Sequence, residues 1–140
     1  MKKIFIMMLA VAFLSCNSDK IISYTYSVVT RGYKMEITVS KDSTRIVQTG
    51  RQSLKKSYAT NANLWKSLKK NSKDIKLKDI SGLESPTNKR QFDGAMFASL
   101  TIATKDSVYR SNSFDAGYPP AMIKNAVDAL AKESEKINEK

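Results

Sequence analysis

Two neighbouring stretches alternate strictly between apolar and polar residues, and this alternation most limits the folds open to the chain. One face of residues 21–29, "IISYTYSVV", carries Ile22, Tyr24, Tyr26 and Val28. One face of residues 33–40, "YKMEITVS", carries Tyr33, Met35, Ile37 and Val39. A period of two is typical of antiparallel strands with one buried face. The sequence therefore predicts a pair of half-buried strands joined through "TRG".

Turn signals and apolar spacing predict the next elements. The "KDS" at 41–43 favours a turn into a third strand, "TRIVQT", because short polar side chains bond nearby backbone groups. Residues 61–71, "NANLWKSLKKN", place Leu64, Trp65 and Leu68 on one side of a helix. Gly, Pro and Asn within 75–90 indicate a loop. Two further strands are expected in 94–104 and 107–114, joined at a second "KDS".

The chain ends on a predicted helix that follows a Pro-Pro pair. Its apolar stripe consists of Ile123, Ala126, Val127, Leu130 and Ile137. Lys124, Asp128 and Lys132 are spaced for i,i+4 pairs on the wet side. The expected fold class is α+β: an antiparallel sheet of about five strands with two helices packed on one face, in the order β-β-β-α-β-β-α. Residues 21–140 are enough for a single domain.

The N-terminus has the pattern of an export signal. Lys2 and Lys3 precede an apolar run over residues 4–14, and a small residue, Ser15, stands before Cys16. That run is too short to cross a hydrocarbon core, which needs about 20 helical residues. A basic start, a short apolar run and a small residue before a boundary predict a secretory signal peptide over residues 1–15. The remaining 125 residues carry a formal net charge of +9.

The stretch "AFLSC" resembles the lipobox of bacterial lipoproteins, although Phe13 stands where that family prefers leucine. The resemblance implies that Cys16 is the lipid attachment site, acylated with palmitate-type chains, and that residues 16–20 form a short tether. Asn17 after the cysteine resembles an outer-membrane address. The expected location is therefore the cell envelope, at the outer membrane. The sequence leaves open whether the protein lies on the periplasmic face or on the cell surface. The alternative is an ordinary cleavable signal with a chance cysteine, which the absence of a disulfide partner disfavours.

The residue types needed for common catalytic sites are scarce. There is no histidine, and no cysteine besides Cys16, so the usual zinc, Ser-His and Cys-His arrangements are excluded. Two "FD" pairs place Asp93 and Asp115 beside glycines at strand boundaries. A carboxylate pair for acid–base work or cation binding is one reading. Local Asx-type bonding is the other, and the favoured one. We therefore expect no enzyme activity, no metal and no cofactor.

Basic residues concentrate in the middle of the chain. Between residues 51 and 78 there are nine Lys and Arg against Asp74 alone. The candidates for binding an anionic surface are Lys66, Lys69, Lys70, Lys73 and Lys76. Such a surface attracts anionic lipid or an acidic polymer. A solvated lysine face kept for solubility is the alternative. Nucleic acid is not expected as a partner of an exported protein, and the aromatic residues suit a core better than a stacking platform.

Residues 92–130, including "RSNSFDAGYPPAMIKNAVDAL", resemble the end of small uncharacterised lipoproteins of Bacteroidota, a resemblance that implies no activity. The favoured hypothesis is a lipid-anchored envelope protein that binds or inhibits a partner without catalysis. One alternative is an accessory subunit of an envelope assembly, in which the helix at 61–73 docks on a partner. Another is a carboxylate-dependent hydrolase.

Overall fold

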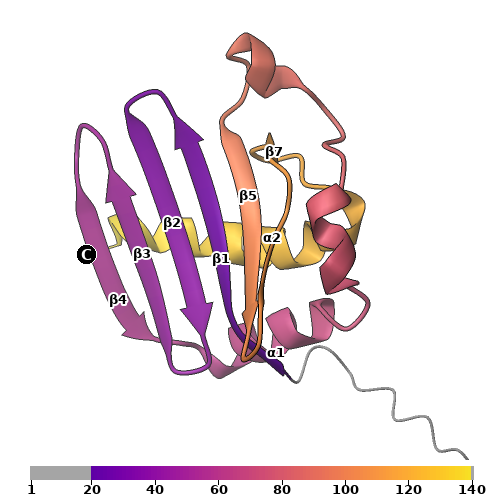
Figure 1. The fold of residues 1–140 in the computed structure, drawn as a ribbon. Helices are drawn as coiled ribbons and strands as arrows, with labels where there is room; N and C mark the ends of the chain where they lie inside the picture. The colour runs from indigo at the N-terminus through magenta and orange to yellow at the C-terminus, as the bar shows by residue number, and fades with distance from the viewer. Residues whose placement is uncertain (1–19, 140) are drawn as a thin grey trace, which may run out of the picture.

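A computed structural model describes residues 20–139, which fold into an antiparallel sheet with helices on one face (Figure 1). The strands are β1 (Ile21–Thr30), β2 (Tyr33–Ser40), β3 (Ser43–Thr49), β4 (Leu54–Ala59), β5 (Phe97–Thr104), β6 (Val108–Arg110) and β7 (Phe114–Asp115). The α-helices are α1 (Ala62–Asn71) and α2 (Lys124–Glu133). The 3₁₀ turns are η2 (Leu77–Gly82), η3 (Lys89–Phe92), η4 (Ala121–Ile123) and η5 (Ser134–Asn138).

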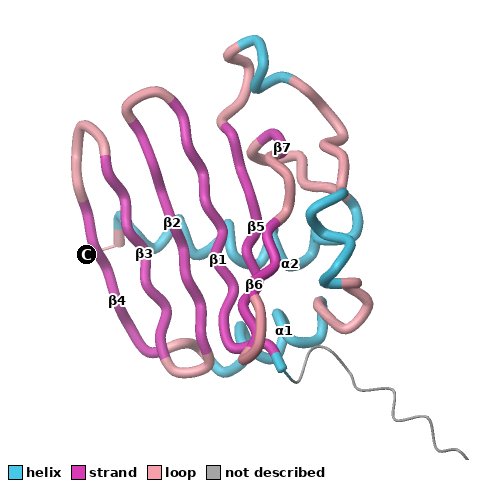
Figure 2. The backbone as a smooth tube through the Cα atoms, viewed as in Figure 1, coloured by secondary structure: helices cyan, strands magenta, loops and turns pink. Residues whose placement is uncertain are grey.

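The strands are arranged in the order β4-β3-β2-β1-β5-β6, and β7 pairs with β5. Every pairing is antiparallel. The first four strands form a meander, and β5 returns on the other side of β1 after the long connection through α1 and the 3₁₀ turns. Figure 2 shows that connection running past the β5 side of the sheet. The predicted α+β class, with helices on one face of an antiparallel sheet, is confirmed.

The core lies between the sheet and the two helices. From β1, β2 and β3, the helix-facing positions Tyr24, Ile37 and Ile46 are fully buried. Leu68 of α1 and Leu130 of α2 close over them, also fully buried. Alternation along the strands and 3.6-residue spacing along the helices thus direct their apolar faces to one layer. The Asn61 side chain caps α1 by accepting from the backbone N–H groups of Asn63 and Leu64.

The sheet has more strands than the sequence predicts. The sequence pattern does not predict β4, because its helix-facing positions include Lys56, which breaks the apolar alternation. At this sheet edge the Lys56 ammonium reaches the carbonyl oxygens of Lys136 and Glu139, at 2.6 and 2.9 Å. The expected strand over 107–114 is interrupted: the Ser111 hydroxyl accepts the Leu100 N–H, and the chain then turns away to β7.

The predicted inward face of the first strand is wrong at one end. Ile22 is 46% exposed, whereas Ile21 is buried. The register of β1 against β5 shifts between Ile21 and Ser23. Because of this irregularity, Ile21 is the buried isoleucine and Ile22 is the exposed one, which is the reverse of what the alternation along the rest of the strand predicts. From Tyr24 onwards the predicted alternation is confirmed.

Candidate functional site

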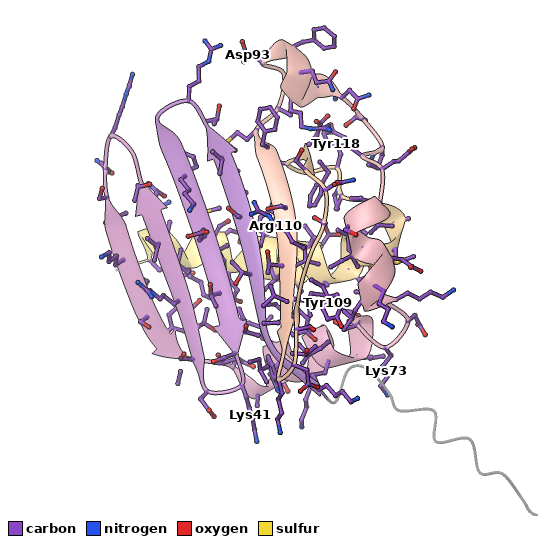
Figure 3. The ribbon with its side chains drawn as sticks, in the orientation of Figure 1. Lys41, Lys73, Asp93, Tyr109, Arg110 and Tyr118 are labelled. Carbon is purple, nitrogen blue, oxygen red and sulfur yellow. The ribbon has the colours of Figure 1, made fainter. Side chains whose placement is uncertain are left out.

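The predicted anionic-surface residues lie on and just after α1. Lys66, Lys70, Lys73 and Lys76 are exposed, while Lys69 is half-buried with its ammonium 5.9 Å from the centre of the Trp65 ring. Helix α1 lies at the end of the sheet where the described chain begins (Figure 1). Figure 3 shows Lys73 and Lys41 at this same end. Cys16, residues 1–15 and most of the predicted tether lie outside the described residues.

Trp65 belongs to the packing of α1 against the sheet. Its ring meets Tyr24 edge-on, with the centroids 5.7 Å apart. The side chain is half-buried rather than presented to solvent. The alternative in which α1 docks on a partner through Trp65 therefore lacks the exposed ring that it requires.

The two FD aspartates do not form a carboxylate pair. Asp115 is fully buried and its carboxylate is occupied by bonds from the segment 87–90. It accepts from the Thr87 hydroxyl, from the backbone N–H of Lys89 (2.7 Å) and from both the backbone N–H (3.1 Å) and the guanidinium (2.9 Å) of Arg90. Asp93 is exposed, in a left-handed conformation with φ of 56°, at the end of η3. The local bonding expected for Asp115 is thus replaced by a long-range clamp.

The clamp keeps Asp115 ionised. Burial alone would raise the pKa of its carboxyl group, but hydrogen bonds from Thr87, Arg90 and Lys89 outweigh burial and hold the pKa well below its ordinary value of 3.8. A carboxylate with every oxygen occupied and a depressed pKa is poorly suited to donate a proton. The arrangement fixes the long connection to β7, and we assign Asp115 a structural role.

A second buried acid joins the C-terminus to the sheet edge. Glu133 accepts from the Tyr58 hydroxyl at 2.5 Å and from the Lys136 ammonium at 2.8 Å. Burial, followed by the bond to Glu133, raises the pKa of the Tyr58 hydroxyl far above its ordinary value. Tyr58 therefore stays protonated and donates. Like Asp115, this group is satisfied within the fold and leaves no reactive atom exposed.

No helix or strand among residues 20–139 covers the side of the sheet turned away from α1 and α2, and we name this side the open face. It consists of the strand positions that alternate with the buried ones. Its hydroxyl residues include Ser23, Thr25, Ser27, Thr38, Ser40, Ser57, Ser99 and Thr101. Its charged residues on the strands are Lys34, Glu36, Arg45, Lys55 and Arg110. The single acid among them, Glu36, is paired with Lys34 at 3.1 Å. The open face is therefore polar and net positive.

A hollow of about 210 Å³ lies on this face between β1, β5 and the segment after β6. Its lining includes Ser27, Ser99, Ser113, Val29, Phe97 and Arg110. Figure 3 shows Arg110 on the side of the sheet opposite the helices. A larger hollow of about 380 Å³ lies beside Arg90 and Glu84, but the Arg90 guanidinium there is already bound by Asp115. Unlike Arg90, Arg110 in the first hollow has no acidic partner in the described part of the chain. A further hollow of about 510 Å³, lined by Arg31 and Arg51, lies at the turns that follow β1 and β3.

Sequence reasoning did not find the open face as a site. Alternation identifies Thr25 and Thr38 as outward-facing, but the pairing of β1 with β5, across the long connection, cannot be read from the sequence. The hairpin of β5 and β6 brings Arg110 beside Ser99, and the pairing of β1 with β5 adds Ser27 next to them. The one local feature of the sequence that points to this site is Arg110, which stands among hydroxyl residues in "VYRSNS".

No protein-family model matches the chain, and no curated protein matches it significantly. Within residues 20–139, no group of three or more Cys, Asp or Glu side chains could hold a metal ion. No helix in the described part of the chain is long and apolar enough to cross a membrane.

Proposed function

We propose that this protein is a lipid-anchored component of the bacterial cell envelope that binds a partner without catalysis. The anchor rests on the resemblance of residues 1–16 to a lipoprotein signal. The observation that carries the binding role is the open face, a broad sheet surface with cations and hydroxyls that no element within residues 20–139 pairs or covers. The two buried acids are satisfied inside the fold, and this favours binding over the hydrolase alternative.

A photo-crosslinking amino acid tests which surface meets the partner. Placed at Thr38, in the middle of the open face, it should give an adduct in intact cells of a native host. The matched position is Lys132, which is exposed on α2. Adducts from Lys132 and none from Thr38 would contradict binding through the open face. Loss of a chemical activity in Asp93→Asn, with folding intact, would instead support the hydrolase.

The exposed lysines on and just after α1 suit a second role, that of holding the anchored domain against the membrane. We call these residues, Lys66, Lys70, Lys73 and Lys76, the α1 lysines. They lie at the end of the molecule where the described chain begins. A tether of residues 17–20 spans at most about 13 Å, at ~3.3 Å per residue. Each basic residue near an anionic surface contributes about 1 kcal/mol, within roughly one Debye length. The anchor and the lysines thus act on the same side of the domain.

Vesicle binding checks this orientation. A chain that begins at Lys20 keeps every described residue, and it should bind vesicles containing anionic lipid more tightly than neutral ones. Changing Lys66, Lys70 and Lys73 to glutamine should weaken that binding by about a hundredfold, on the basis of ~1 kcal/mol per residue. The control removes Arg31 and Arg51 from the other end of the strands. Equal binding to both vesicle types, or equal loss in the control, would make the α1 lysines a solvated face only.

A further inference from the structure

We infer that the open face binds an acidic polysaccharide, with Arg110 and Arg45 each engaging a carboxylate. This inference names the partner class of the binding surface and rests on the proposed function. It follows from the order of side chains across the sheet, from the hollow beside Arg110, and from the residue types that the open face lacks.

One row of the open face has a cation near each end and neutral hydroxyls between. The strand register places the row in the order Arg110, Thr101, Thr25, Thr38 and Arg45. Strands are spaced by about 4.8 Å, so the backbones that carry the two arginines are roughly 19 Å apart. A single small acid cannot bridge that span. A polymer that carries carboxylates along a hydroxylated chain can do so.

Most N–H donors of Arg110 and Arg45 make no hydrogen bond within the described residues. The only hydrogen bond of the Arg110 guanidinium within the described residues is to the Ser99 hydroxyl, at a long 3.4 Å. The Arg45 guanidinium makes no hydrogen bond or ion pair there. A guanidinium offers five N–H donors in a planar fork that matches a carboxylate. Both groups can therefore take an external anion without breaking an existing ion pair.

The hollow next to Arg110 adds polar and apolar contacts. The Ser27 and Ser113 hydroxyls line it and have no hydrogen-bond partner in the described part of the chain. At its other end, Val29 pairs with Phe97 across the strands, and the two side chains are 40% and 46% exposed. A sugar ring presents the same combination, with hydroxyls at its rim and C–H groups on its face. The hollow thus fits one ring that carries a carboxylate toward Arg110.

The open face lacks what nucleic acid would need. Phe97 is the one aromatic residue on this face of the described strands, because the tyrosines of β1, β2, β4 and β6 point to the helix side. Binding of single-stranded nucleic acid draws about 1–3 kcal/mol per base from aromatic stacking. With a single ring, the face favours a polyanion recognised by arginine and hydroxyls.

Titration with oligogalacturonates of defined length tests the inference. The full chain, purified in nonionic detergent, should bind a hexamer, should bind a dimer much more weakly because it cannot reach both arginines, and should ignore neutral dextran. Arg110→Gln and Arg45→Gln should each weaken hexamer binding by about tenfold, the effect of losing one charge-assisted hydrogen bond. Added salt should weaken binding as well.

The matched controls are Arg31→Gln and Lys132→Gln, which remove one exposed positive charge away from the row. They should leave hexamer affinity within about twofold. Equal losses in the controls would reduce the effect to net charge and overturn the inference, as would tighter binding of polyphosphate or single-stranded DNA than of the hexamer. A protein adduct at Thr38 with no hexamer binding would overturn the polysaccharide but keep the proposed binding role of the open face.

Discussion

Replacing Asp115 by alanine should cause one of the largest losses of stability available in this chain. The carboxylate is fully buried and holds the Arg90 guanidinium and the backbone N–H groups of Lys89 and Arg90. Removing it leaves a nearly buried cation and two backbone donors without a partner, which is among the costlier changes a fold can undergo. We expect the melting temperature to fall by on the order of 10 °C.

The same substitution should loosen the segment around η3. Trypsin should then cleave after Lys89 and Arg90 under native conditions, because local opening governs cleavage. The matched variant is Asp93→Asn, which alters an exposed aspartate in the same loop and should leave melting and cleavage unchanged. Similar effects from both variants would mean that the clamp contributes nothing specific.

Lowering the pH should remove the contribution of the Asp115 carboxylate to the free energy of unfolding. Its pKa in the folded protein lies below the ordinary 3.8, so the stabilisation is complete above about pH 4 and declines as the pH falls toward the folded-state pKa. The free energy of unfolding of Asp115→Asn should therefore approach that of the original protein as the pH falls below 3.8. A stability difference that stays constant from pH 7 to pH 2 would contradict the depressed pKa.

The second large effect is expected from Phe114→Ala. Phe114 in β7 is fully buried, and truncating a buried phenylalanine costs about 3–5 kcal/mol through lost transfer energy and the cavity left behind. Since whole domains are stable by only about 5–15 kcal/mol, the urea midpoint should fall markedly. The single tryptophan, Trp65, reports the transition through its fluorescence.

Phe92→Ala is the control for this prediction. Phe92 is 82% exposed in η3, so the same truncation there removes little buried surface. Its urea midpoint should stay close to that of the unchanged chain. If Phe92→Ala were as destabilising as Phe114→Ala, the assignment of Phe114 to the core and Phe92 to the surface would be wrong.

Local patterns predicted most of the fold because burial follows a simple period in most elements. The alternation in β2 and the stripe of α2 each match the faces that the structure buries. The pattern does not predict β4 because a lysine takes a helix-facing position at the sheet edge, where its long side chain bends to the carbonyls of Lys136 and Glu139. The break between β6 and β7 depends on one serine hydroxyl replacing a backbone partner.

The candidate site was less predictable because it depends on long-range pairing. The lysine set was visible in the sequence, and the structure brings four of its five members to the surface. The open face requires Arg110, Thr25 and Arg45 to share a row, which follows from the register of strands far apart in the chain. The clamp at Asp115 likewise joins residues 25–28 positions apart.

The intact mass of the protein extracted from membranes of a native host tests the proposed envelope role most directly, alongside a Cys16→Ala variant. We predict a mature chain that begins at Cys16 and carries the added mass of acyl chains, and the variant should lack that mass. This result would place the open face and the α1 lysines beside a membrane. A soluble, unacylated chain that still contains an unmodified Cys16 would contradict the lipid anchor and the envelope function built on it.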